Sequence, residues 1–236
     1  GWRYQRKLWN ACRLASMRLE DYNATSEIEL ELIDRWILSK LQKTIDECTE
    51  AMENCDFMNS TEKARNFIWH VFCDHYLEAA KTRLYGEGKG KLSAQYTLHK
   101  SIESMLKLIA PIIPHLSEEI WRIMYDPDKS IHISEWPMQS ADLIDTEAEK
   151  TGDVVIAAIS DIRREKNRKG VSLNTPVKKL GLYAPKEMLE HLRLGEQDIK
   201  DTLKVENIEF DTGEKGDSKI EEYPEISFRL LIDDKS

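Results

Sequence analysis

The sequence predicts a mainly α fold, with an antiparallel helix bundle over residues 1–170 and a small α/β subdomain over residues 171–236. Apolar residues recur every three or four positions through most of the first 170 residues, which is typical of amphipathic helices. Glycine and proline, with 10 and 7 copies, interrupt this pattern where helices should end. Beyond Gly170, apolar and polar residues alternate in short runs, which indicates strands.

Three helices are expected in the first 85 residues. The first covers residues 1–18 and the second covers about residues 30–53, each with an apolar stripe along one face. The third begins at a capping residue, Asn59 or Ser60. It ends near Tyr85, because a glycine-rich segment follows.

The rest of the predicted bundle consists of helices separated by prolines and polar segments. Pro111 and Pro114 should break or kink the chain, because proline lacks a backbone N–H donor. Gly170 should end the last helix of the bundle. In order, the expected elements are helices over residues 92–110 and 115–125, a connector over 126–142 with an extended piece at 131–133, and a helix over 147–169.

The predicted subdomain alternates strands with short helices. Pro185 is well placed at the start of a helix, and a polar turn around Gly213 and Gly216 joins two strands. The expected elements are a strand over residues 177–183, helices over 186–193 and 196–203, and strands over 205–210 and 226–232.

Composition excludes several classes of protein. Hydrophobic residues make up 41% and charged residues 33% of the 236 positions, which suits a globular chain with a core rather than a disordered one. The most apolar run, residues 106–116, contains a lysine and two prolines and is too short to cross a bilayer. The chain begins Gly-Trp-Arg-Tyr-Gln, without an initiator Met or a signal peptide. We therefore expect a piece of a longer protein, with no membrane partner.

Basic residues are concentrated in two segments of a chain whose formal net charge is −9. Residues 1–18 contain five basic residues and no acid, and residues 163–179 contain seven basic residues and one acid. Such patches on an acidic body could hold a polyanion, or they could be solvated faces. At about 100° per residue, the first helix gathers one arc of side chains: Arg3, Arg6, Lys7, Asn10, Arg13 and Leu14.

No catalytic site and no metal site is predicted. The four cysteines, at positions 12, 48, 55 and 73, form no Cys-x-x-Cys pair, and the six histidines are scattered. Neither a Walker A loop nor Gly-x-Ser-x-Gly is present. We expect reduced thiols in the core of a cytoplasmic protein.

Several segments carry a family resemblance. The most specific are Phe72-Cys-Asp-His-Tyr-Leu-Glu-Ala-Ala-Lys81 and Leu108-Ile-Ala-Pro-Ile-Ile-Pro-His-Leu-Ser-Glu-Glu-Ile-Trp121. The others are Lys7-Leu-Trp-Asn-Ala-Cys-Arg13, Asp34-Arg-Trp-Ile-Leu38, Ser134-Glu-Trp-Pro137, Ile162-Arg-Arg-Glu-Lys-Asn-Arg-Lys-Gly170 and Leu173-Asn-Thr-Pro176. In this order, over about residues 1–180, they resemble the C-terminal anticodon-binding domain of valyl-tRNA synthetases, which are class I aminoacyl-tRNA synthetases.

The resemblance implies a role for individual side chains. The first helix and the helix that carries Leu77 and Lys81 would flank the anticodon loop. Lys7 and Arg13 would then be base-reading donors, and Leu77 would pack on a base unless it is a core leucine. Arg6 and Lys81 would contact phosphates or the rest of the loop.

Other positions in the same set have less specific roles. Arg3 and Asn10 add donors to the arc. Leu14 stands where family members often have an aromatic residue, so base stacking would be weakened or replaced by apolar contact. Arg163 and Arg164 would touch the tRNA backbone, or would belong to a solvated face.

The resemblance also implies partners. The family's ATP-site signatures, His-x-Gly-His and Lys-Met-Ser-Lys-Ser, are absent from the chain. The chain would therefore be a non-catalytic, monomeric part of a valine–tRNA ligase, without a cofactor of its own, in a parent that uses ATP and Mg. Its partners would be valine tRNAs, whose anticodons end in A-C, and the catalytic domain of the parent. The alternatives are a helical protein-interaction module and the anticodon domain of the isoleucine, leucine or methionine relatives.

Overall fold

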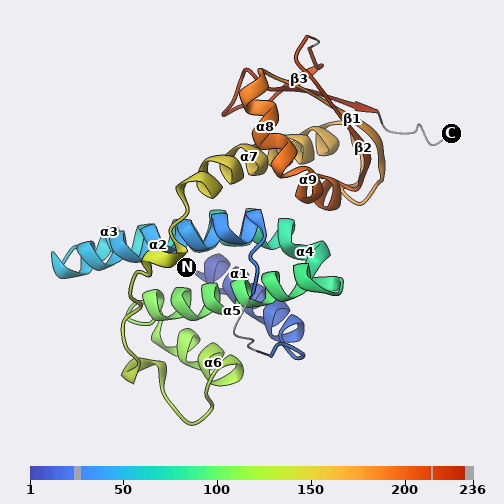
Figure 1. The fold of residues 1–236 in the computed structure, drawn as a ribbon. Coiled ribbons are helices and arrows are strands. Elements are labelled where there is room, and N and C mark those ends of the chain that lie inside the picture. Colours follow the sequence, from blue (N-terminus) through green and yellow to red (C-terminus); the bar gives the residue numbers. More distant parts are fainter. Residues whose placement is uncertain (24–27, 214, 232–236) are drawn as a thin grey trace. The chain divides into compact units, whose positions relative to one another are not determined.

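The computed structural model describes residues 1–23, 28–213 and 215–231 (Figure 1). The predicted fold class is confirmed, because the chain is mainly helical and its C-terminal part holds a small mixed sheet. The chain divides into two compact units. The first comprises Gly1–Glu78 and Arg83–Asp145, and the second comprises Ala79–Thr82 and Thr146–Ser236.

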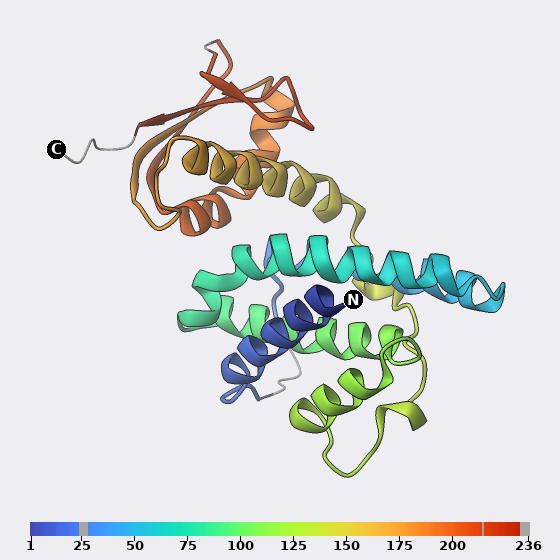
Figure 2. The ribbon, with the colours of Figure 1, turned by 180° about the vertical axis from the view of Figure 1, so that it is seen from behind.

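The first unit is a helical bundle. Its elements are α1 (Trp2–Arg18), α2 (Leu32–Glu53), α3 (Phe57–Asn66), the π-helix η1 (Phe67–Tyr76), the two ends of α4 (Leu77–Tyr85), α5 (Lys89–Ile109), α6 (Pro114–Met124) and the 3₁₀ turns η2 (Ile131–Ile133) and η3 (Ala141–Leu143). The middle of α4, Ala79–Thr82, belongs to the second unit. Helix α2 packs against α3 and α5, and α1 packs against η1, α5 and α6. Figure 2 shows α1 on the outside of the bundle, running across the helices behind it.

Two local predictions in this unit are wrong. Helix α3 begins at Phe57 rather than at Asn59 or Ser60, because the Asp56 carboxylate accepts a hydrogen bond from the Asn59 backbone N–H at 3.1 Å. The segment at 131–133 is a 3₁₀ turn and not an extended piece.

The predicted third helix is continuous in the structure, but its middle part is π-helical. In η1 the backbone bonds run from i to i+5, which widens the turn and shifts the faces that follow it. Phe67, Phe72 and Tyr76 point into the core, whereas Trp69 and Asp74 reach the surface. Such segments often occur at functional sites.

A buried carboxylate joins three parts of the bundle. The fully buried Asp34 of α2 accepts a hydrogen bond from the Tyr76 hydroxyl at 2.8 Å, and it also accepts bonds from the Arg83 guanidinium and the Ser93 hydroxyl. Burial, followed by the Asp34 charge, raises the pKa of Tyr76 well above its ordinary value and keeps the phenol a donor. These partners satisfy a charge whose burial would otherwise be costly, so Asp34 can be buried only when the three segments come together.

The second unit combines helices with a mixed sheet. Its elements are α7 (Thr146–Arg168), β1 (Val177–Tyr183), α8 (Lys186–Leu194), α9 (Glu196–Leu203), β2 (Val205–Asp211), β3 (Ser218–Lys219) and β4 (Ser227–Leu231). The strand order is β2-β1-β4-β3, with β1 parallel to β2 and antiparallel to β4. Strand β3 was not predicted, and Ile232 of the predicted last strand lies outside the described residues.

Helix α7 explains where the two units divide. The boundary predicted at residue 170 places this helix in the bundle. In the structure α7 packs against α8 and α9 and belongs to the second unit. Gly170 follows α7 with a φ of +69°, a left-handed conformation that glycine adopts without strain and that is typical of a helix end.

The described residues contain neither a membrane-spanning helix nor a cluster of metal-binding side chains. No helix among them is both long enough and apolar enough to cross a membrane. In the same residues, no group of three or more His, Cys, Asp or Glu side chains is arranged to hold a metal ion.

Candidate nucleic-acid interface

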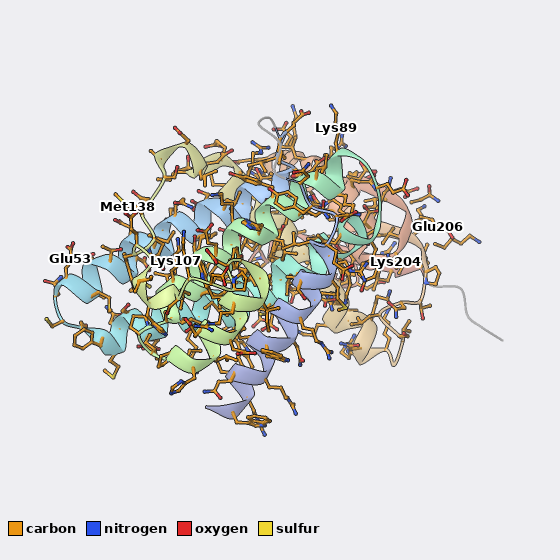
Figure 3. All side chains as sticks on the ribbon, turned by 90° about the horizontal axis from the view of Figure 1, so that it is seen from below. Glu53, Lys89, Lys107, Met138, Lys204 and Glu206 are labelled. Atoms are coloured by element: carbon orange, nitrogen blue, oxygen red, sulfur yellow. The ribbon has the colours of Figure 1, made fainter. Side chains whose placement is uncertain are left out.

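Helix α1 buries one face and exposes a row of polar side chains on another. The buried residues are Leu8, Ala11, Cys12 and Ala15. The exposed residues, spaced by three or four positions, are Arg3, Arg6, Asn10 and Arg13. Within the described part of the chain, none of these arginines is ion-paired with a carboxylate. Helix α1 therefore presents three guanidinium groups on one rigid element, and Figure 3 shows this helix at the edge of the bundle.

Lys7 differs from these arginines because it has partners. Its Nζ lies 2.5 Å from Oδ1 of Asp74, and it stands 4.1 Å from the centroid of the Trp69 ring. The other Asp74 oxygen lies 3.3 Å from Nδ1 of His70. Lys7 is half-buried, so it would have to share or leave Asp74 in order to contact a ligand.

Three other residues of the predicted site, Leu14, Leu77 and Lys81, differ in how exposed their side chains are. Leu14 is half-buried beside Arg13 and leaves apolar surface accessible. Leu77 is only 6% exposed, and its burial favours the alternative that it is a core leucine. Lys81 is exposed on α4 but already has an interaction partner.

The second basic segment is largely engaged within its own unit. Arg164 pairs with Asp161 at 3.0 Å and with Glu221 at 2.5 Å, and Arg163 also has a partner. Lys166 is fully buried, and its Nζ donates hydrogen bonds to the carbonyl oxygens of Leu173, Thr175 and Leu203 at 3.0, 2.7 and 3.2 Å. These contacts favour a structural role for the segment over contact with tRNA.

The structure reveals one feature that the sequence analysis missed. An open cleft of about 550 Å³ lies where the start of α1 meets the junction of α3 and η1. We call it the aromatic cleft, and its lining residues are Gly1, Trp2, Arg3, Tyr4, Arg65, Asn66, Trp69 and His70. Of these, only Arg3 was predicted as a site residue. The signal was weak, because aromatic residues on a helix are usually core residues.

Several ionisable side chains on the buried side of α1 are shielded from water, and this burial shifts their pKa values. Burial raises the pKa of Cys73 to about 12, although the nearby Lys7 charge opposes this shift. Burial also raises the pKa of Cys12 and Tyr4 above their ordinary values. These groups stay protonated at neutral pH, so the charge of this face comes from the side chains on its surface.

Basic residues clustered along one helix are typical of a surface that binds nucleic acid, and comparison with known proteins gives the family. Residues 34–180 match the model of the anticodon-binding domain of tRNA ligases. The chain belongs to this family, as an anticodon-binding domain of the class I tRNA ligases.

The relatives that match over most of the chain are valine–tRNA ligases. The ligase of Pyrococcus horikoshii is 37% identical over 90% of the chain, and that of Methanocaldococcus jannaschii is 38% identical over the whole chain. The ligase of Methanothermobacter thermautotrophicus is 35% identical over 98% of the chain. These matches cover 24%, 26% and 25% of the relatives' own lengths, so the chain spans about a quarter of each.

Proposed function

We propose that this chain recognises the anticodon loop of valine tRNAs as part of a valine–tRNA ligase. The observation that carries the proposal is the row of Arg3, Arg6 and Arg13 on α1, exposed and without carboxylate partners among the described residues. Single-stranded loops suit such a surface, because their bases can be turned outward and read on their Watson–Crick edges. Membership of an anticodon-binding family supports the same substrate.

Hydrogen-bonding chemistry links this row to valine. Valine codons begin with G-U, so every valine anticodon ends in A-C. Cytosine offers acceptors at O2 and N3, which Arg13 can meet with two guanidinium N–H groups. Adenine offers an acceptor at N1 and a donor at N6, and the Asn10 amide carries both complements. Leu14 supplies apolar contact beside these donors, and Arg3 and Arg6 contact phosphates.

In this proposal Lys7 contacts the RNA only if it exchanges its partner Asp74 for a group of the RNA. Its ion pair with Asp74 lies at the surface and is half-solvated, and such pairs contribute little free energy. An RNA phosphate or a base acceptor can therefore compete for the ammonium group at small cost. Lys7 reads or neutralises the loop only after that exchange.

The parent protein would complete the reaction. On this proposal, valine is attached to tRNA with ATP and Mg in domains outside the chain, and the chain itself is non-catalytic and holds no cofactor. The catalytic domain of the parent is its covalent neighbour. We place the ligase in the cytoplasm as a monomer.

Fluorescence anisotropy tests the proposal. Labelled valine tRNA and a variant with a swapped anticodon are titrated with the chain, and the valine tRNA should bind more tightly. About four phosphate contacts predict a slope near −3 for log affinity against log salt, at roughly −0.7 per contact. Equal affinity for both tRNAs would exclude base reading.

Two outcomes would favour the other interpretations. Absent or salt-insensitive binding would favour a helical protein-interaction module. Preference for an isoleucine, leucine or methionine anticodon would assign the chain to those relatives.

A further inference from the structure

Two stacked aromatic rings form one side of the aromatic cleft. The rings of Tyr4 and Trp69 lie nearly parallel, with 14° between their planes and 6.2 Å between their centroids. Tyr4 and Trp69 are both half-buried, whereas His70 is exposed. The Lys7 ammonium group covers part of the Trp69 ring at 4.1 Å. The exposed part of the indole, which Tyr4 and Lys7 hold in place, offers a planar ligand a rigid surface.

The charge of the cleft is positive. Its lining contains Arg3 and Arg65 and no acidic residue. Both guanidinium groups are exposed, and neither forms an ion pair with a described carboxylate. The groove next to it shares Arg65 and Asn66 and is lined by three lysines, Lys40, Lys43 and Lys63, but two acids, Glu47 and Glu62, stand among them. Of the two sites, the aromatic cleft is therefore better suited to an anion that carries a flat ring.

We propose that the aromatic cleft binds one unpaired nucleotide of the RNA that α1 contacts, with the base stacked on Trp69 and the phosphate held by Arg3 and Arg65. The inference rests on the proposed function. Tyr4 precedes Arg13 by nine residues, which is about 13 Å along a helix. The nucleotide in the cleft is therefore not the one that Arg13 reads. Because every base has a π face, this subsite adds affinity with little sequence preference.

A coupling experiment tests this subsite. The chain and its Trp69→Ala variant are titrated with valine anticodon stem-loops in which one loop base at a time is removed to leave an abasic nucleotide. Trp69→Ala should weaken binding of the intact stem-loop about 5- to 150-fold, the range expected for one stacked base. Removal of the one base that occupies the cleft should weaken wild-type binding similarly and make Trp69→Ala silent.

Matched variants separate stacking from folding. Trp69→Phe keeps a ring and should retain most of the affinity. Trp136→Ala removes a half-buried tryptophan elsewhere in the first unit, whose Nε1 donates to the Thr49 hydroxyl at 2.9 Å, and should leave RNA binding within twofold. Arg65→Ala should make the salt slope less steep by about 0.7, the contribution of one phosphate contact.

The outcomes distinguish this inference from the proposed function. If Trp69→Ala has no effect, or weakens every abasic stem-loop by the same factor, the subsite is refuted while anticodon reading stands. If the wild-type chain binds valine and swapped anticodons equally, the proposed function fails. Coupling between Trp69 and one loop base would then still show that the cleft holds a nucleotide.

Discussion

The buried Asp34 carboxylate supports the bundle that carries α1, and replacing it tests how strongly. Asp34→Asn keeps the size of the side chain but removes the charge that the Arg83 guanidinium faces. Removing one partner of a buried ion pair costs about 3–5 kcal/mol. Against a total stability of about 5–15 kcal/mol for a typical domain, the variant should unfold at a much lower urea concentration.

Tryptophan emission makes this measurement specific. All six tryptophans, at positions 2, 9, 36, 69, 121 and 136, belong to the first unit. Urea titration followed by tryptophan fluorescence therefore reports unfolding of the bundle.

The matched control is Glu47→Gln on the same helix. Glu47 pairs with Lys63 at 2.9 Å with both side chains partly exposed, and exposed pairs contribute up to about 1 kcal/mol. If Asp34→Asn costs no more than Glu47→Gln, the network around Asp34 does not stabilise the bundle and the reasoning is refuted.

Three further predictions concern Lys166 and the cysteines. Lys166→Met removes the donor of three carbonyl oxygens, of which that of Leu203 is buried and those of Leu173 and Thr175 are partly buried. An unsatisfied buried group costs about 1–3 kcal/mol, so amide hydrogen exchange in α7 and β1 should become faster. Unchanged exchange would contradict this. Burial lowers the pKa of Lys166 below its ordinary value of 10.5. The folded chain therefore binds fewer protons than the unfolded chain between those two values, and the stability of the second unit should rise with pH there in the wild type but not in Lys166→Met. At pH 8 iodoacetamide should alkylate the exposed Cys55 before Cys73, as measured by peptide mass spectrometry. The reason is that Cys73, with a pKa of about 12, is a thiolate in only about one molecule in ten thousand at this pH. Faster labelling of Cys73 would show that its surroundings are not dry.

The sequence predicted those parts of the fold that depend on local patterns. The span of α1, the order of the helices and the stop at Gly170 follow from periodicity and from one residue that tolerates a positive φ. The start of α3 was misplaced, because Asp56 competes as a cap with the equally suitable Asn59 and Ser60. The π-helical form of η1 has no comparable local signature.

Features that depend on distant residues were not predictable in the same way. Lys7 was expected on an exposed arc, but its partner Asp74 lies 67 positions further along the chain. Lys166 was counted within a basic patch, and only the folding of the loop after α7 turns its ammonium group inward. The aromatic cleft forms where α1 meets η1, so neither segment alone reveals it.

The most direct test of the central claim compares Arg13→Ala with the wild-type chain on two stem-loops that differ only in the last anticodon base, cytosine or uracil. The wild type should prefer the cytosine stem-loop, and Arg13→Ala should lose about 1–3 kcal/mol of that preference, as for other bidentate base contacts. The exposed Lys129→Ala should leave it unchanged. If Arg13→Ala binds both stem-loops more weakly by the same factor, or binds both as the wild type does, Arg13 does not read the anticodon.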